Sequence, residues 1–147
     1  MSGGLVVDTS VAIKWLIDEP DHAWARTLPK LGLPMIAPDL MLSEASNALW
    51  KIQRRGLLAG GEPLVMLDRL VAADLEIVAC APAIHRQALA LATRLDHPAY
   101  DCLYLALALS RGAALATADA RFARVLRRDG ALPEARLLIP PEPASPA

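Results

Sequence analysis

Two aspartates stand where an α/β protein places its reactive groups. Asp8 directly follows the apolar run 5–7, and Asp119 comes shortly after a second such run at 113–116. Short apolar runs rich in β-branched or small residues, bounded by turn signals, are typical of buried strands. Ligands of open α/β sheets bind outside the carboxyl ends of the strands, which is where both aspartates are expected.

Two further acids belong to predicted helices. Glu44 lies on the margin of the apolar face of a helix expected from Asp39 to about Arg55. It follows Asp39 by five residues, so it cannot be the acid of a capping box, which stands three residues after the cap. Asp101 lies at the start of a stretch, 98–111, that is apolar on nearly every side. Its first turn is therefore expected close to the core.

Each of these acids alone also has an ordinary structural explanation. An aspartate between a strand and a helix is more often a helix cap than a catalyst. Glu44 can form a surface ion pair with Lys51 or Arg55, and an acid such as Asp101 in a first turn is favoured by the helix dipole. These alternatives stay open for each residue taken singly.

Brought together at one edge of a sheet, the four acids predict a site for a hard divalent cation. Clustered carboxylates repel one another, and at least one would hold a proton in the absence of a counter-charge. Mg²⁺ or Mn²⁺ accepts carboxylate oxygens together with waters and still leaves positions for phosphate oxygens. The chemistry that suits such a site is metal-assisted phosphodiester hydrolysis, with either one or two ions.

The elements that position these acids alternate along the chain. Strands are predicted at 5–7, 35–37, 76–78, 113–116 and 136–139. Helices are predicted at 9–17 with Thr9 or Ser10 as the cap, 21–31, 39–55, 62–73, 82–95, 98–111 with Asp96 or His97 as the cap, and 119–128. This alternation favours a three-layer α/β fold with a mainly parallel sheet of about five short strands flanked by helices. We expect one domain over 1–139 and a flexible proline-rich tail over 140–147.

Composition excludes several classes of protein. The chain has 147 residues, is 54% hydrophobic and has a formal net charge of −1, which is incompatible with a disordered chain. That charge also argues against a protein that coats nucleic acid by bulk electrostatics. Cys80 and Cys102 have no zinc-ligand spacing and are expected to be small core residues in a reducing compartment. No secretory signal or membrane-spanning run is present, so we expect a soluble cytoplasmic protein.

Four segments of the sequence, in order, resemble the motifs of the PIN-domain family, and within it the VapC-like ribonuclease toxins of type II toxin–antitoxin pairs. The four segments are 6–10 (VVDTS), 43–49 (SEASNAL), 100–106 (YDCLYLA) and 117–122 (TADARF). Each segment alone is weak, but all four in this order and spacing are specific, and they cover nearly the whole chain.

The resemblance implies a metal-dependent endoribonuclease with Asp8, Glu44, Asp101 and Asp119 around Mg²⁺ or Mn²⁺. It implies supporting roles for Thr117, for Ser10 or Thr9, and for Asn47, which follows Glu44 by one helical turn. It also implies a homodimer, and inhibition by a small cognate antitoxin that lays a segment across a groove of the toxin.

Two groups of side chains are candidates for binding these partners. Arg121, Arg124 and Arg128 share one face of a helix that begins beside Asp119, where they could contact RNA phosphates. The alternative is a solvated arginine face. Trp15 and Trp50 are candidates for an antitoxin groove, because tryptophan is enriched at interface hot spots; burial in the core is the alternative.

Two other functions compete with the nuclease. A receiver-like domain that binds Mg²⁺ and accepts a phosphoryl group would have adjacent acids after the first strand and a late lysine at a strand end. Here Thr9 follows Asp8, and no lysine occurs after Lys51. In a non-catalytic α/β interaction module, the acids would be caps and surface pairs only.

Overall fold

The computed structural model describes residues 3–143 and contains a sheet of five short strands in which all four pairings are parallel. The spatial order is β3-β2-β1-β4-β5. The strands are β1 (Leu5–Val7), β2 (Met35–Pro38), β3 (Glu76–Val78), β4 (Ala114–Ala116) and β5 (Leu137–Leu138). The predicted α/β fold with a parallel sheet of about five strands is confirmed.

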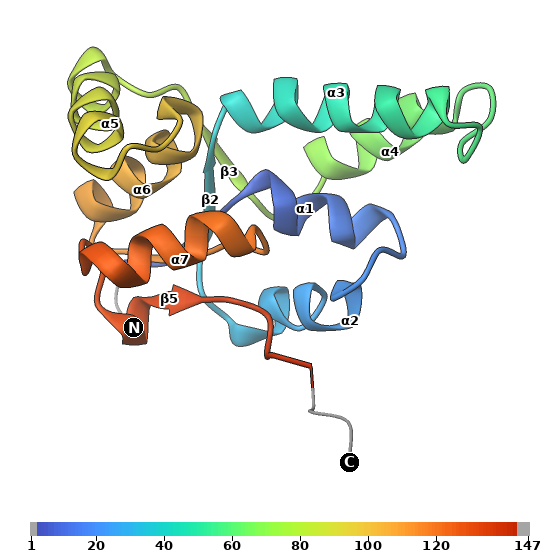
Figure 1. The fold of residues 1–147 in the computed structure, drawn as a ribbon. Helices are drawn as coiled ribbons and strands as arrows, with labels where there is room; N and C mark the ends of the chain where they lie inside the picture. Colours follow the sequence, from blue (N-terminus) through green and yellow to red (C-terminus); the bar gives the residue numbers. More distant parts are fainter. Residues whose placement is uncertain (1–2, 144–147) are drawn as a thin grey trace.

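Helices cover both faces of the sheet. Figure 1 shows α5 and α6 on one side of the strands and α1, α3 and α4 on the other. The seven helices of the described residues are α1 (Thr9–Leu16), α2 (His22–Ala25), α3 (Leu40–Arg54), α4 (Glu62–Val71), α5 (Pro82–Leu95), α6 (Ala99–Arg111) and α7 (Ala120–Asp129). Short 3₁₀ helices occupy Leu28–Leu31 and Glu134–Arg136. None of the helices described here is long and apolar enough to cross a membrane.

Strand β1 is the centre of the sheet and is completely buried. Two glycines precede it, with φ of +102° at Gly3 and +87° at Gly4. A Cβ at Gly3 would lie 2.5 Å from the Gly112 carbonyl oxygen, and one at Gly4 would lie 2.6 Å from that of Pro34. Only glycine allows both the left-handed backbone and this close approach. The pair therefore lets β1 enter between its two neighbouring strands.

Helix α6 is the central helix of the core. Every residue from Cys102 to Ala108 is buried, as the all-round apolar sequence of this helix predicts. It packs against α5 and against β1, β2 and β4. Because Asp101 is in the first turn of this helix, its position is fixed by an element that is largely buried in the core.

Several predicted element ends are wrong. Asp8, rather than Thr9 or Ser10, occupies the N-cap position of α1, and its side chain makes no cap bond. The helix predicted over 21–31 is two short pieces, His22–Ala25 and Leu28–Leu31; Pro29 has no backbone N–H with which to continue the first piece. Asp96 ends α5 in the left-handed region, and Pro98 rather than Asp96 or His97 occupies the N-cap of α6. The last strand is only two residues long.

One smaller prediction also needs correction. Cys102 is buried, but Cys80 is only half-buried, so it is not a full core residue. Of the proline-rich tail, residues 140–143 line a hollow together with Asp119 and Arg124. Residues 144–147 lie outside the described residues.

The order of the strands reverses at β1. The chain moves from β1 to β2 and β3 on one side, then returns to place β4 on the other side of β1. Such a switch point, at the carboxyl ends of adjacent strands, is where open α/β sheets bind ligands. Asp8 follows β1 and Thr117 follows β4, so this edge brings together two of the predicted site segments.

Candidate active site

Asp8 is a buried carboxylate held by two hydroxyls. Its Oδ2 accepts hydrogen bonds from Thr117 Oγ1 at 2.7 Å and from Ser10 Oγ at 2.9 Å, and the residue is only 5% exposed. Burial raises the pKa of Asp8 to about 7. The two hydroxyls oppose that rise, while the negative charges of Asp101 and Glu44 add to it. This repulsion indicates that the three acids share one electrostatic environment.

Thr117 and Ser10 tie the ends of β1 and β4 together. Thr117 Oγ1 accepts from the Asp119 amide at 3.1 Å, and Ser10 Oγ accepts from the Ala118 amide at 2.9 Å. The two hydroxyl oxygens lie 3.4 Å apart. The structure thus brings two of the predicted supporting residues, Thr117 and Ser10, to Asp8, and they connect it to the loop that carries Asp119.

Glu44 reaches inward from α3 and meets two hydroxyls. Thr9 Oγ1 lies 2.9 Å and Tyr104 Oη 2.6 Å from its Oε1. No ion pair joins Glu44 to Lys51 or Arg55 in residues 3–143, so the surface-pair explanation does not describe this side chain. Burial strongly raises the pKa of the Tyr104 hydroxyl, and its bond to Glu44 adds to the rise, so the phenol remains a hydrogen-bond donor.

Asp101 is paired with a buried histidine. His97 Nε2 lies 2.7 Å from Asp101 Oδ2, and the imidazole, 6% exposed, stacks on Phe122 with ring centroids 4.9 Å apart. His97 Nδ1 has no hydrogen-bond partner among the described residues. The His97 ring is therefore held between the carboxylate of Asp101, which binds its Nε2, and Phe122 of α7, on which it stacks.

Asp119 caps helix α7, which is the structural role that its position between a strand and a helix suggests. Its Oδ1 accepts from the amides of Arg121 and Phe122 at 2.9 and 3.2 Å, at the N-terminus of α7. Only one carboxylate oxygen is used in this way. Capping therefore fixes Asp119 in place without using its second oxygen.

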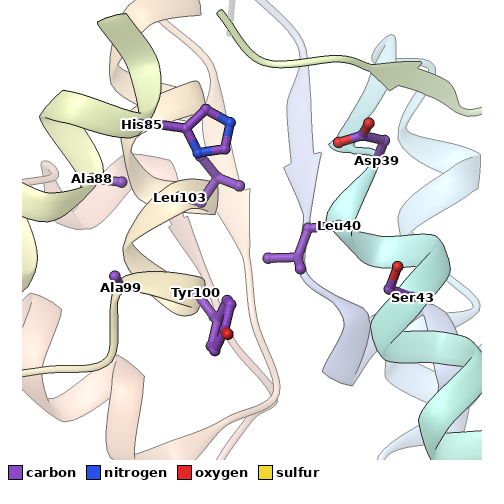
Figure 2. A pocket seen from close by; sticks show the side chains of 8 residues that line it. All are labelled: Asp39, Leu40, Ser43, His85, Ala88, Ala99, Tyr100 and Leu103. Atoms are coloured by element: carbon purple, nitrogen blue, oxygen red, sulfur yellow. The ribbon is translucent and has the colours of Figure 1, made fainter. Parts of the chain in front are cut away.

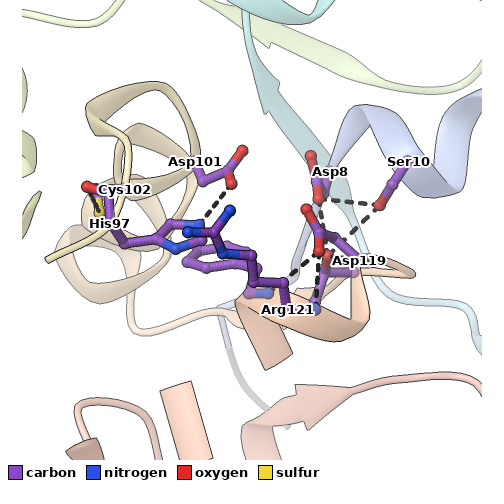
Figure 3. A network of polar contacts seen from close by, with 9 residues as sticks. Asp8, Ser10, His97, Asp101, Cys102, Asp119 and Arg121 are labelled. Carbon is purple, nitrogen blue, oxygen red and sulfur yellow. Dashed lines mark hydrogen bonds and ion pairs between the residues drawn. The ribbon is translucent and has the colours of Figure 1, made fainter. Parts of the chain in front are cut away.

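The four acids share a hydrogen-bonding pattern and a cavity. In residues 3–143, protein donors bind one oxygen of each carboxylate and leave the other without a bond. All four line one cavity of about 310 Å³, which Asn47 and Lys51 also line. Figure 3 shows Asp8, Asp101 and Asp119 converging from three elements, with the hydrogen bonds that hold them. The site thus presents four anchored acids, each with one free oxygen.

This donor set suits a hydrated divalent cation better than a bare one. No three Asp, Glu, His or Cys side chains of residues 3–143 are arranged so that they could hold a metal ion together. Mg²⁺ commonly keeps several waters and takes only one or two carboxylates directly. Oxygen-only donors and the mutual repulsion felt at Asp8 fit such an ion, with waters bridging to the more distant acids.

A second cavity, of about 570 Å³, lies beside His97. Its lining contains four arginines of α7: Arg121, Arg124, Arg127 and Arg128. Arg127 forms an ion pair with Glu134 at 2.8 Å, whereas the three predicted RNA-contact arginines have no acidic partner within residues 3–143. The structure therefore places Arg121, Arg124 and Arg128 along one hollow, and the amide of Arg121 is bound to Asp119.

The two tryptophans predicted for an antitoxin groove differ from each other. Trp15 is half-buried, and its indole nitrogen donates to the Ala25 carbonyl oxygen at 2.9 Å, which ties α1 to α2. Trp50 is 49% exposed on α3, with the Arg54 guanidinium 5.0 Å from its ring. Trp50 is therefore exposed enough to contact a partner, whereas Trp15 packs within the protein.

Another hollow, of about 350 Å³, lies between the start of α3 and the helices α5 and α6 (Figure 2). Leu40 and Ser43 line it from α3, His85 from α5, and Tyr100 and Leu103 from α6. None of the four acids lines it, so it is distinct from the acid-lined cavity. Its exposed Tyr100 directly precedes Asp101 in α6.

Tyr104 is the residue of this site that sequence patterns do not identify. They predict it only as part of the apolar helix around Asp101. One signal is available, because a tyrosine that belongs to a buried helix must direct its hydroxyl to a polar partner. The spacing of three from Asp101 places it on the same helix face.

Comparison with known proteins agrees with this geometry. A family model described as the PIN domain matches residues 5–127. Ribonuclease VapC3 of Pyrobaculum aerophilum is 33% identical over 121 residues, which cover 81% of this chain and 92% of that protein. The chain therefore belongs to the PIN domain family, among its VapC-like ribonucleases, as the four sequence motifs predicted.

Solved structures share the fold at lower sequence identity. PAE2754 from Pyrobaculum aerophilum matches with a TM-score of 0.67 and 22% identity, over 85% of this chain and 86% of that one. VapC20 from Mycobacterium tuberculosis, described as a sarcin-ricin loop cleaving toxin, has a TM-score of 0.65 and 17% identity over 82% and 93%. VapBC2 from Rickettsia felis, solved bound to a DNA fragment from their promoter, matches with a TM-score of 0.62 and 18% identity. The match covers 92% of this chain and 96% of that one.

Proposed function

We propose that this protein is a metal-dependent endoribonuclease that hydrolyses RNA phosphodiester bonds, and that it is the toxin of a toxin–antitoxin pair. The observation that carries the proposal is the cavity lined by four anchored carboxylates, each with one free oxygen. Preorganised charge of this kind is costly to build and serves to stabilise charge at a reacting centre. The ribonuclease name of the 33% identical relative supports RNA as the substrate.

The four acids have separate tasks in this proposal. Asp8, Asp101, Asp119 and Glu44, which line one cavity, would surround a hydrated Mg²⁺ or Mn²⁺ ion, with waters bridging between the ion and those acids that do not bind it directly. The bound ion would lower the pKa of a water and offset charge on the leaving oxygen. Thr117 and Ser10 keep Asp8 in place, and Asn47, which also lines the cavity, is a candidate for contacting substrate or water.

A cognate antitoxin and a second copy of the chain are the proposed protein partners. Support for an antitoxin comes from the two-component VapBC2 complex, which shares the fold. The exposed Trp50 on α3 is the candidate of this chain for contacting that antitoxin. An RNA substrate and an antitoxin partner imply that the proposed action takes place in the cytoplasm.

The competing functions are less compatible with the geometry. A receiver-like phosphoacceptor would have adjacent acids after the first strand, but Thr9 rather than a second acid follows Asp8, and no lysine occurs after Lys51. A non-catalytic interaction module would have no need of free carboxylate oxygens. Burial raises the pKa of Asp8 to about 7, and keeping such a group charged is unfavourable for an acid with only a structural role.

The proposal is tested by incubating purified, antitoxin-free protein with a broad panel of tRNA, rRNA and mRNA. We expect internal cleavage with Mg²⁺ or Mn²⁺ and none with EDTA. Intact RNA across the whole panel in the presence of either metal would refute the nuclease function. Analysis of the cleaved ends separates endonucleolytic from exonucleolytic products.

Removal of Arg121, Arg124 and Arg128 is expected to weaken RNA binding in a salt-dependent manner. Each arginine that neutralises a phosphate adds about 0.7 to the slope of log affinity against log salt for single-stranded RNA, so its removal should lower the slope by that amount. The measurement is fluorescence anisotropy of a labelled RNA at several salt concentrations, with alanine substitutions made in a cleavage-defective background. Arg69→Ala, on exposed α4, is the matched control. An equal decrease of affinity in that control would show that only net charge matters.

A further inference from the structure

A buried triangle of oxygens joins three elements behind Glu44. Tyr104 Oη of α6 lies 2.6 Å from Thr9 Oγ1 of α1, and both hydroxyls lie within hydrogen-bond distance of Glu44 Oε1 of α3. Tyr104 is completely buried and Thr9 is 8% exposed. These contacts link residues 35 to 95 positions apart in the sequence.

Packing alone does not account for the hydroxyl of Tyr104. It is the only hydroxyl among the buried residues 102–108, where the other side chains are Leu, Ala and Cys. Burying a hydroxyl is unfavourable unless a partner compensates it. Phenylalanine would fill the same space without that requirement. The partner that the structure provides is the carboxylate of Glu44.

We propose that Tyr104, with Thr9 as a second donor, is a positioning residue that fixes Glu44 by Oε1 and so leaves Oε2 free for a divalent cation in the acid-lined cavity. This inference rests on the proposed metal-dependent function. A free glutamate has several rotamers, and binding a cation would have to restrict them. The two hydroxyls restrict them beforehand.

The location of Tyr104 on α6 adds a second constraint. Asp101 is one helical turn earlier on the same helix, so one rigid element carries one acid and holds another. The distance between Glu44 and Asp101 therefore depends on α6 rather than on contacts of α3 alone. Groups that orient metal ligands in this way affect metal affinity even though they do not touch the metal.

Tyr104→Phe removes the donor while keeping the ring. We expect its affinity for Mn²⁺ alone, measured by electron paramagnetic resonance titration, to fall by about tenfold or more. Tyr100→Phe is the matched control, because Tyr100 is on the same helix but is 68% exposed and outside the cavity. Its Mn²⁺ affinity should equal that of the wild type. Circular dichroism of both variants reports whether the fold is intact.

A double substitution separates positioning from general support of the fold. If Tyr104 acts through Glu44, Tyr104→Phe should cause no further decrease of Mn²⁺ affinity in a Glu44→Gln background. Full additivity of the two effects would overturn the inference. Thr9→Val removes the other donor and should weaken Mn²⁺ binding in the same direction. It decides the question on its own if Tyr104→Phe does not fold.

The outcomes distinguish this inference from the proposed function. Wild-type Mn²⁺ affinity in both Tyr104→Phe and Thr9→Val, with RNA cleavage by the wild-type protein intact, overturns the positioning role alone. A wild-type protein that binds no Mn²⁺ overturns both. Weakened binding in the two variants, with Tyr100→Phe unchanged, supports the role of Tyr104.

Discussion

Asp8→Asn and Asp101→Asn are each expected to lower metal-dependent RNA cleavage by about a hundredfold or more, the size of effect typical when a group that stabilises transition-state charge is removed. The hydrogen bonds explain why asparagine is a poor substitute. Its single oxygen would stay with the donors already present, the hydroxyls of Ser10 and Thr117 or the ring of His97. The amide nitrogen would then take the place of the free oxygen, and it cannot bind a cation.

The measurement is the initial rate of cleavage of one RNA at saturating Mg²⁺. Asp74→Asn, on an exposed segment before β3, is the matched control for the removal of one charge and should cleave like the wild type. Circular dichroism must show that each variant is folded. Wild-type rates in Asp8→Asn and Asp101→Asn would remove both carboxylates from the reaction.

The sequence predicts the acids better than it predicts what holds them. Strand ends at a switch point are recognisable from short apolar runs and their order, and this locates Asp8 and Asp119. Helical periodicity locates Glu44 and Asp101. None of these patterns contains the bond between Tyr104 and Glu44, which depends on how α3 and α6 pack and joins residues 60 positions apart.

Local rules also fail where a side chain is needed elsewhere. Capping preferences predict Thr9 or Ser10 at the start of α1, but Thr9 is bonded to Glu44 and Ser10 to Asp8. Asp8 takes the cap position while its carboxylate turns to Ser10 and Thr117 instead of the helix amides. At Asp119 the structural and the functional explanations are compatible, because the cap uses one oxygen only. A helix cap can therefore also be a metal ligand.

Asp8→Asn is also expected to stabilise the metal-free protein at pH 8, although it removes activity. Burial raises the pKa of Asp8 to about 7 in the folded protein from 3.8. Between these values the folded state holds a proton that the unfolded chain has released, so stability falls as the pH rises. The decrease is on the order of 4 kcal/mol, complete above about pH 7. Asparagine carries no charge, so Asp8→Asn does not suffer this loss of stability.

The prediction is checked by urea unfolding of both proteins at pH 4 and pH 8 in EDTA. The free energy of unfolding of Asp8→Asn minus that of the wild type should increase from pH 4 to pH 8. Taking this difference cancels the titration of the groups that do not interact with Asp8. A difference that stays constant or decreases from pH 4 to pH 8 would contradict the raised pKa of Asp8.

Added Mg²⁺ should reverse the order of the two proteins at pH 8. A cation that binds only the folded state stabilises it by mass action and compensates the buried charge of Asp8. The wild type should therefore gain stability with Mg²⁺ concentration, while Asp8→Asn gains little because it lacks one of the proposed metal-binding carboxylates. The same carboxylate would then destabilise the empty protein and stabilise the loaded one, which is the expected property of a binding group and not of a structural cap.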